Sequence, residues 1–118
     1  MARNEAATRL ELIDPALRDA GWGVVDGSRI RPEMIAPGRI EPSGVRGKSS
    51  TADYVLVFRN QKLAVIEAKA EDKADTAGLG QAKRDAERLQ ARFAYSTNGK
   101  GIYQADLRTG EEGYVDRY

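Results

Sequence analysis

The chain has 118 residues, of which 41% are hydrophobic and 31% are charged, and its formal net charge is +1. It contains no cysteine and no histidine, which excludes thiol nucleophiles, the Ser-His-Asp triad and zinc sites built on these side chains. Hydrolytic chemistry would therefore rest on carboxylates, lysine or hydroxyl groups, and any metal would be a hard cation held by oxygen.

The length and composition indicate one globular domain, residues 1–118, rather than a disordered chain. The sequence has no run of about 18 or more apolar residues, which a membrane-spanning helix would need. Its first 14 residues are charged and amphipathic and lack the apolar core of a signal peptide. We therefore expect a cytoplasmic protein.

The first predicted element is a helix over residues 4–20, which Pro15 either kinks or divides into two helices. Gly21 and Gly23 are natural stop residues for it. A short strand is predicted at Val24–Val25, followed by a loop that extends to the Gly/Ser-rich segment 41–50. The apolar positions of the first helix share helical spacing: Ala7, Leu10, Ile13 and Leu17.

Two apolar strands are predicted next, at Tyr54–Phe58 and Leu63–Lys69, with residues 59–62 as the turn between them. A helix is predicted over residues 80–93, followed by short strands at 93–98 and 101–107 and by a turn at 108–113 that precedes residues 114–118. Asn98-Gly99 is a typical turn dipeptide. This order of elements predicts an α/β fold in which a mixed central sheet is flanked by helices.

Charged residues stand at neighbouring ends of the two apolar strands. Glu67 and Lys69 lie on one face of their strand because strand side chains alternate. A two-residue turn would pair Tyr54 with Glu67 and place Asp53 on the opposite face. A three-residue turn, or a bulge, would pair Asp53 with Glu67. Directly opposed carboxylates repel each other, so the second arrangement requires a cation between them.

If the two acids converge, they could bind Mg²⁺ and leave several waters on the metal, with the Ala68 carbonyl as a further ligand. Such a metal lowers the pKa of a bound water and stabilises charge on a phosphoryl oxygen. Lys69 could orient the attacking water or neutralise the phosphate. The alternative is that the charges are ordinary solvated strand ends.

The D-x13-E-x-K hairpin between two helices resembles the PD-(D/E)xK nuclease core, the fold of restriction endonucleases. "ADYVLVF", "LAVIEAKAE" and "GLGQAKRDAERLQARFAYSTNGKGIYQADLRTGEEG" resemble the N-terminal nuclease domain of the restriction (motor) subunit of type I restriction–modification enzymes. The resemblance covers nearly the whole chain. It implies Mg²⁺-dependent cleavage of DNA phosphodiester bonds, with Mn²⁺ as a substitute, and no sequence specificity of the domain's own.

Carried over by position, Asp53 and Glu67 would hold the metal and Lys69 would serve the nucleophile. Glu5, in the first helix, matches an acidic residue that many members add to the metal site. Its alternative role is that of a first-turn helix acid in water.

Gln81 matches the glutamine of the family's Q-x-x-x-Y motif, which lies on the helix beside the site. The tyrosine of this motif is replaced by Asp85, and the proline of the Pro-Asp pair by Ala52. Asp85 adds negative charge near DNA and metal, which argues against activity.

The resemblance also implies partners. In the family the nuclease domain is joined to helicase lobes, which use ATP, and it works with methylation and specificity subunits, so we expect this chain to be one domain of a larger subunit. ATP binding is not expected here, because "PSGVRGKSS" lacks the first glycine and the following helix of a phosphate-binding loop. DNA contacts are predicted at Arg46, Lys48, Lys83, Arg84 and Arg88.

Two other functions remain open on the sequence. The domain could be a non-catalytic DNA-binding or assembly module that keeps the nuclease fold and is inactive in isolation. It could also be a plain structural domain. Metal binding would distinguish the nuclease from the structural domain, and cleavage in isolation would distinguish it from the non-catalytic module.

Overall fold

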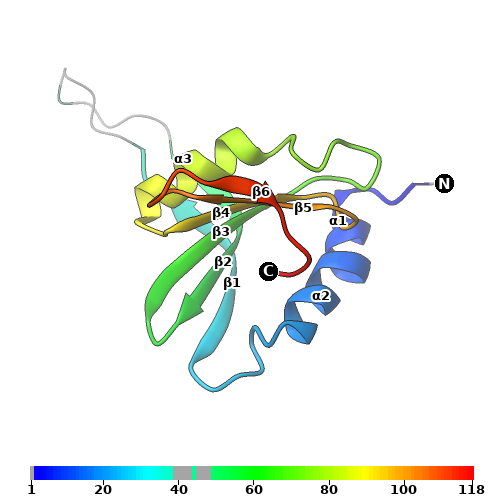
Figure 1. Cartoon of the computed structure of the whole chain (residues 1–118), viewed down its shortest axis with the longest axis horizontal. Helices are drawn as coiled ribbons and strands as arrows, with labels where there is room; N and C mark the ends of the chain where they lie inside the picture. Colours follow the sequence, from blue (N-terminus) through cyan, green and yellow to red (C-terminus); the bar gives the residue numbers. More distant parts are fainter. Residues whose placement is uncertain (1, 39–43, 45–48) are drawn as a thin grey trace.

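A computed structural model describes residues 2–38, 44 and 49–118. The strands form a six-stranded sheet in which their order follows the chain, and only β3 and β4 are parallel neighbours (Figure 1). The predicted mixed α/β architecture is thereby confirmed. The helical segments are α1 (Glu5–Thr8), η1 (Arg9–Ile13), α2 (Asp14–Asp19) and α3 (Leu79–Leu89), and the strands are β1 (Ser28–Ala36), β2 (Ser50–Phe58), β3 (Gln61–Ala68), β4 (Phe93–Thr97), β5 (Ile102–Asp106) and β6 (Glu112–Tyr114).

The molecule has three layers, with a separate apolar core on each face of the sheet (Figure 1). On one face, Val55 and Val65 pack with Ala82 and Ala86 of α3. On the other face, side chains of the same two strands pack with Ile13 and Leu17 from the N-terminal helices. Because β2 and β3 are covered on both sides, they read as nearly continuous apolar runs in the sequence.

The N-terminal helices form one run with a π-helical turn in its middle, where the amide of Asp14 donates to the carbonyl of Arg9 five residues earlier. Pro15 occupies the first turn of α2, where a missing N–H is tolerated. The extra residue of a π-turn shifts the phase of the helix. Thr8 and Ile13 are consequently buried, whereas Leu10, predicted to lie on the apolar face, is 70% exposed.

The prediction for residues 24–36 is wrong. Val24 and Val25 are exposed and lie in turns, and the strand is β1, which begins at Ser28 and carries Pro32 in its interior. A proline is accommodated because, within the described part of the chain, β1 is an edge strand that pairs only with β2. Polar edge strands lack the apolar alternation that the sequence prediction relied on.

The β2–β3 hairpin combines a two-residue turn with a bulge. Arg59 and Asn60 both have positive φ, of 50° and 67°, as in the primed turns that join twisted strands. The pairing then shifts between Val57–Lys62 and Leu56–Ala64, so that Leu63 is the extra residue. The bulge is thus the alternative that the structure adopts.

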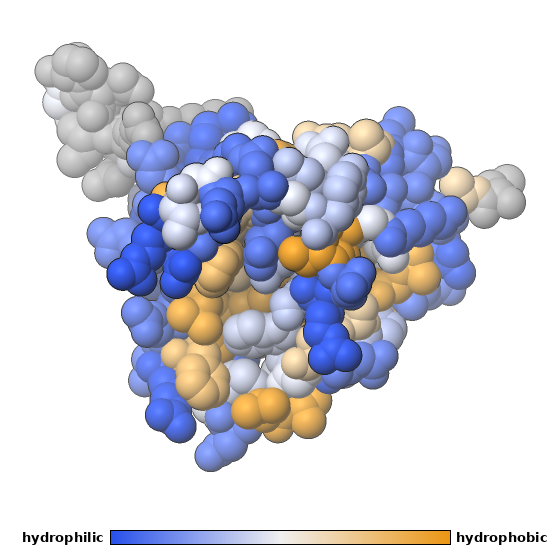
Figure 2. All heavy atoms as spheres, in the orientation of Figure 1, coloured by the Kyte–Doolittle hydropathy of each residue, from blue (hydrophilic) through white to orange (hydrophobic). Residues whose placement is uncertain are grey.

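The surface is mostly hydrophilic on the face seen in Figure 2, and hydrophobic residues reach it in small groups rather than in one broad patch. A broad patch would have suggested a protein interface on this face. Among the residues that the structure describes, no helix is long and apolar enough to cross a membrane.

Candidate active site

The bulge brings the two predicted acids together at one end of the hairpin. One residue beyond the Tyr54–Ile66 pair, Asp53 comes opposite Glu67, and both lie on the α3 face, two residues from Val55 and Val65. Oδ2 of Asp53 accepts a hydrogen bond of 2.8 Å from the amide of Ala68. This bond fixes the Asp53 carboxylate against the end of β3.

The electrostatics of the pair favour a bound cation. Glu67 is only 3% exposed, and its burial, together with the charge of Asp53, raises its pKa from 4.5 to about 8. A divalent ion between the two carboxylates would offset both effects. The oxygen-only donors suit Mg²⁺ or Mn²⁺. The amide of Ala68 faces Asp53, and a role for the Ala68 carbonyl as a further metal ligand stays a prediction.

Lys69 lies beside this pair, under the start of α3. A Cβ placed on Gly78, the residue that precedes α3, would lie 2.9 Å from Cβ of Glu67 and 3.4 Å from Cε of Lys69. The amide of Gly78 donates to Oγ of Ser96, which donates in turn to the carbonyl of Asp75. The connector between β3 and α3 is thus held directly over Glu67 and Lys69.

Helix α3 contributes two polar residues. Nε2 of Gln81 donates to Oε1 of Glu67 at 3.4 Å, which places Gln81 next to one of the two carboxylates. Asp85, one turn later, is fully buried; its Oδ1 accepts from Oγ of Ser50, while its Oδ2 has no hydrogen-bond partner among the residues that the structure describes. The charge of Asp85 also contributes to the raised pKa of Glu67.

Sequence reasoning missed Arg9, which approaches Asp53 from the N-terminal helices. Its Nη2 donates to the carbonyl of Asp53 at 3.2 Å, and its Nη1 lies 3.8 Å from Oδ1 of Asp53. Its Nη1 also donates to Oε1 of Glu33 at 2.6 Å. The residue was hard to foresee because its direction depends on the π-turn that begins there, which helical periodicity does not contain.

Glu5 is exposed in the first turn of α1, and across residues 2–38, 44 and 49–118 no group of three or more acidic side chains gathers as a metal cage. The hairpin brings two carboxylates together, Asp53 and Glu67, and a role for Glu5 in metal binding stays a prediction. Mg²⁺ is commonly held in this way, by one or two carboxylates with water in the remaining positions.

The predicted DNA contacts differ in their surroundings. Arg46 and Lys48 lie outside the described residues. On α3, Arg84 is exposed, and Arg84 and Arg88 follow Gln81 by three and seven residues, so the three lie along one side of the helix. Nζ of Lys83 pairs with Glu112 of β6 at 2.6 Å, so Lys83 points toward the C-terminal strands.

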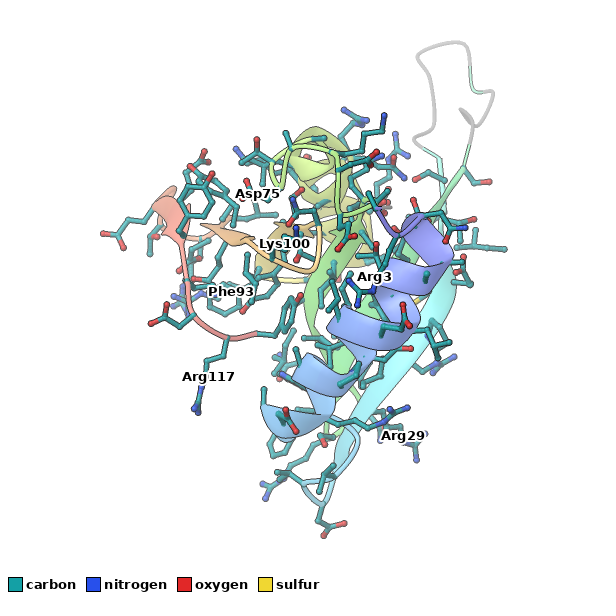
Figure 3. All side chains as sticks on the ribbon, turned by 90° about the vertical axis from the view of Figure 1, so that its right-hand side faces the viewer. Arg3, Arg29, Asp75, Phe93, Lys100 and Arg117 are labelled. Carbon is teal, nitrogen blue, oxygen red and sulfur yellow. The ribbon has the colours of Figure 1, made fainter. Side chains whose placement is uncertain are left out.

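The N-terminus closes the same end of the sheet. Nη1 of Arg3 pairs with Glu71 at 3.0 Å, and Asn98 donates to the carbonyl of Lys73, so the N-terminus, the β3–α3 connector and the β4–β5 turn come together. Figure 3 shows the Arg3 side chain beside the N-terminal helix, with Asp75 and Lys100 on the loops above it. The N-terminal segment and the loops that follow β3 and β4 thus meet at the end of the sheet where β3 ends.

Comparison with known proteins is consistent with this geometry. No family model matches the chain. It is 32% identical over 112 residues to the type I restriction enzyme EcoAI endonuclease subunit of Escherichia coli, which covers 91% of this chain and 14% of that protein. It is 38% identical over 63 residues to the crossover junction endodeoxyribonuclease RuvC of Methylocella silvestris, which covers 53% of this chain and 34% of the relative.

A solved structure matches the whole chain. A fragment assigned to the HsdR subunit of a type I restriction enzyme from Vibrio vulnificus YJ016 is 39% identical, with a TM-score of 0.85, over 100% of this chain and 24% of the solved one. The chain thus spans about a seventh to a third of the length of these relatives. The resemblance predicted from the motifs is confirmed: the chain is homologous to part of the endonuclease subunit of type I restriction enzymes.

Proposed function

We propose that this chain is the nuclease domain of a type I restriction endonuclease subunit and that it hydrolyses DNA phosphodiester bonds. The observation that carries the proposal is the pairing of Asp53 with Glu67, beside Lys69, at the end of the β2–β3 hairpin. Two of the relatives are named as endonucleases and the third as a subunit of a restriction enzyme, which supports the same reaction class. The substrate and the larger complex are part of the proposal.

In the proposed reaction Asp53 and Glu67 would hold Mg²⁺ or Mn²⁺, with the Ala68 carbonyl as a further ligand. When bound, such an ion supplies an activated water and stabilises charge on a phosphoryl oxygen. The amide of Ala68 keeps the Asp53 carboxylate oriented. Gln81 does the same for Glu67 through Oε1. Lys69, on the same face of β3, orients the attacking water or neutralises the phosphate.

The proposed substrate contacts need no base-specific recognition. Arg84 and Arg88 continue from Gln81 along α3 and would contact the DNA backbone, which carries charge but no direct sequence information. Sequence choice would then belong to other subunits of a restriction complex. The helicase lobes and methylation subunits of such a complex are the partners that we propose.

The deciding experiment is calorimetric titration of Mg²⁺ and Mn²⁺ into the metal-free protein, alongside Glu67→Ala, with plasmid nicking measured on the same samples. We expect binding and nicking in the natural protein and neither in the variant. Exposed Glu111→Ala is the matched control and should retain both. Binding without nicking would favour the non-catalytic module. The first variant to test would then be Asp85→Tyr, which introduces the tyrosine of the family motif. Absence of metal binding would refute the proposed site.

A further inference from the structure

The guanidinium of Arg9 is held in place on three sides. Its Nε donates to the hydroxyl of Tyr54 and its Nη2 to the carbonyl of Asp53, both at 3.2 Å. The group also lies 4.6 Å from the centre of the Tyr54 ring. The Arg9 side chain is only 19% exposed. It is therefore preorganised, and little conformational entropy would be lost when a ligand binds to it.

The remaining side of Arg9 faces a partner that is easily exchanged. Its Nη1 donates to Glu33, whose side chain is 57% exposed. Ion pairs with a solvated partner contribute little to stability, so another anion can replace the Glu33 carboxylate at modest cost. The same Nη1 lies 3.8 Å from Oδ1 of Asp53, which places the exchangeable position next to the carboxylate pair.

The backbone of Glu33 gives an independent indication that Glu33 and Arg9 belong to a functional site. Its φ is +56°, in the left-handed region that residues other than glycine rarely adopt. It lies between the pairs Pro32–Tyr54 and Met34–Ala52 in the β1–β2 register, and so opposite Asp53. Backbone outliers of this kind concentrate at functional sites. Here the outlier presents the carboxylate that meets Arg9.

We propose that Arg9 is a DNA-phosphate ligand of the site, and that Glu33 holds its Nη1 until a backbone phosphate replaces the Glu33 carboxylate. The inference rests on the proposed function. A guanidinium matches phosphate oxygens in geometry and charge. The location beside Asp53 means that the phosphate held by Arg9 would be the scissile one or its immediate neighbour.

The test measures the affinity of the whole chain for a short labelled DNA duplex over a range of salt concentrations. Measurements are made in EDTA, and again with Mg²⁺ in a Lys69→Ala background, so that the duplex stays intact. Arg9→Ala should lower affinity about fivefold and reduce the salt slope by about one phosphate contact. Glu33→Gln, a change at an exposed side chain, should raise affinity about threefold because Arg9 is then free.

A double-mutant cycle separates release of Arg9 from a general charge effect. The gain from Glu33→Gln should disappear in the Arg9→Ala background. The controls are Arg92→Ala and Asp106→Asn, which make the same changes of charge in another ion pair. Arg92 and Asp106 are 2.8 Å apart and lie beyond the other end of β4. Both variants should leave the DNA affinity and its salt dependence nearly unchanged. Arg9→Lys should recover only part of the affinity, since an ammonium cannot reproduce the three fixed contacts.

Two results would overturn the inference while leaving the proposed nuclease function intact. One is that the natural chain binds DNA and Arg9→Ala weakens binding no more than Arg92→Ala. The other is that the Glu33→Gln gain persists in the absence of Arg9. If neither the natural chain in EDTA nor the Lys69→Ala chain in Mg²⁺ binds DNA, the inference and the proposed function both fail.

Discussion

Glu67 is buried beside another acidic side chain, and this should make the stability of the metal-free protein depend on pH. Its pKa is raised from 4.5 to about 8 in the folded state, so between these values the unfolded chain releases the proton more readily than the folded one. The free energy of unfolding should therefore fall as pH rises from about 4.5 to about 8. Urea denaturation in EDTA at a series of pH values measures this.

Glu67→Gln should remove most of that dependence and make the metal-free protein more stable than the natural one at pH 8, because the amide carries no charge to bury. Glu111→Gln changes an exposed carboxylate and should leave the pH profile as it is. A natural protein whose stability is flat from pH 5 to pH 8 would show that Glu67 ionises at its usual pKa.

Gly78 and Gly80 allow a matched comparison at the start of α3. A Cβ at Gly78 would meet Cβ of Glu67 at 2.9 Å, so Gly78→Ala should cost about 1–3 kcal/mol of stability and weaken metal binding. At Gly80 the nearest atom is the flexible end of Arg84, at 3.5 Å, so Gly80→Ala should be neutral or stabilise by up to about 1 kcal/mol. Thermal melts with and without Mn²⁺ measure the stability and the metal binding of both variants. Equal losses in Gly78→Ala and Gly80→Ala would contradict the close approach of Gly78 to Glu67.

The sequence predicts some residues of the site better than others. Asp53, Glu67 and Lys69 form a spaced motif on strands with a clear apolar pattern, so their convergence could be foreseen as one of two possible registers. Arg9 and Glu33 could not, because the first depends on a π-turn and the second on a left-handed residue in a polar edge strand. Neither feature produces a periodic pattern in the sequence.

Among the elements, the β2–β3 hairpin shows how one extra residue determines whether the two carboxylates lie on the same face of the sheet. With a two-residue turn alone, strand alternation would place Asp53 and Glu67 on opposite faces. The extra residue Leu63 corrects the register, and a one-residue shift moves every later side chain to the other face. The sequence narrowed the pairing to two alternatives, but turn type and bulge together decide it, and only the fold reveals the bulge.

The N-terminal helical run allows a test of which of its side chains face the core. Regular helical spacing puts Leu10 and Ile13 on the same apolar face, whereas the π-turn leaves Leu10 70% exposed and Ile13 fully buried. Ile13→Ala should therefore cost about 2–5 kcal/mol of stability, and Leu10→Ala less than about 0.5 kcal/mol. Urea denaturation of the two variants decides between the arrangements. Comparable losses at both positions would indicate a regular α-helix there.

At the scale of the whole molecule, the order of elements was sufficient to predict the fold class, since apolar strands alternate with helical segments. The site, however, is assembled from all three layers: the carboxylate pair from the sheet, Gln81 and Gly78 from the α3 side, and Arg9 from the N-terminal helices. Such an assembly couples the ligand to global stability, because each layer would have to be in place for the ligand to bind.

Metal binding should consequently stabilise the entire domain. A ligand that binds only the folded state adds about 2.7 kcal/mol when its free concentration is 100 times Kd, so Mn²⁺ or Mg²⁺ should raise the melting temperature in a dose-dependent way. Asp53→Asn and Glu67→Gln should each abolish the shift while remaining folded, since each keeps the shape of the side chain. Arg92→Ala breaks a distant exposed ion pair, and its melting temperature should rise with metal as much as that of the natural protein does. A rise of equal size in the two carboxylate variants would mean that the ion binds elsewhere, and the pair at the end of the hairpin would not be the metal site.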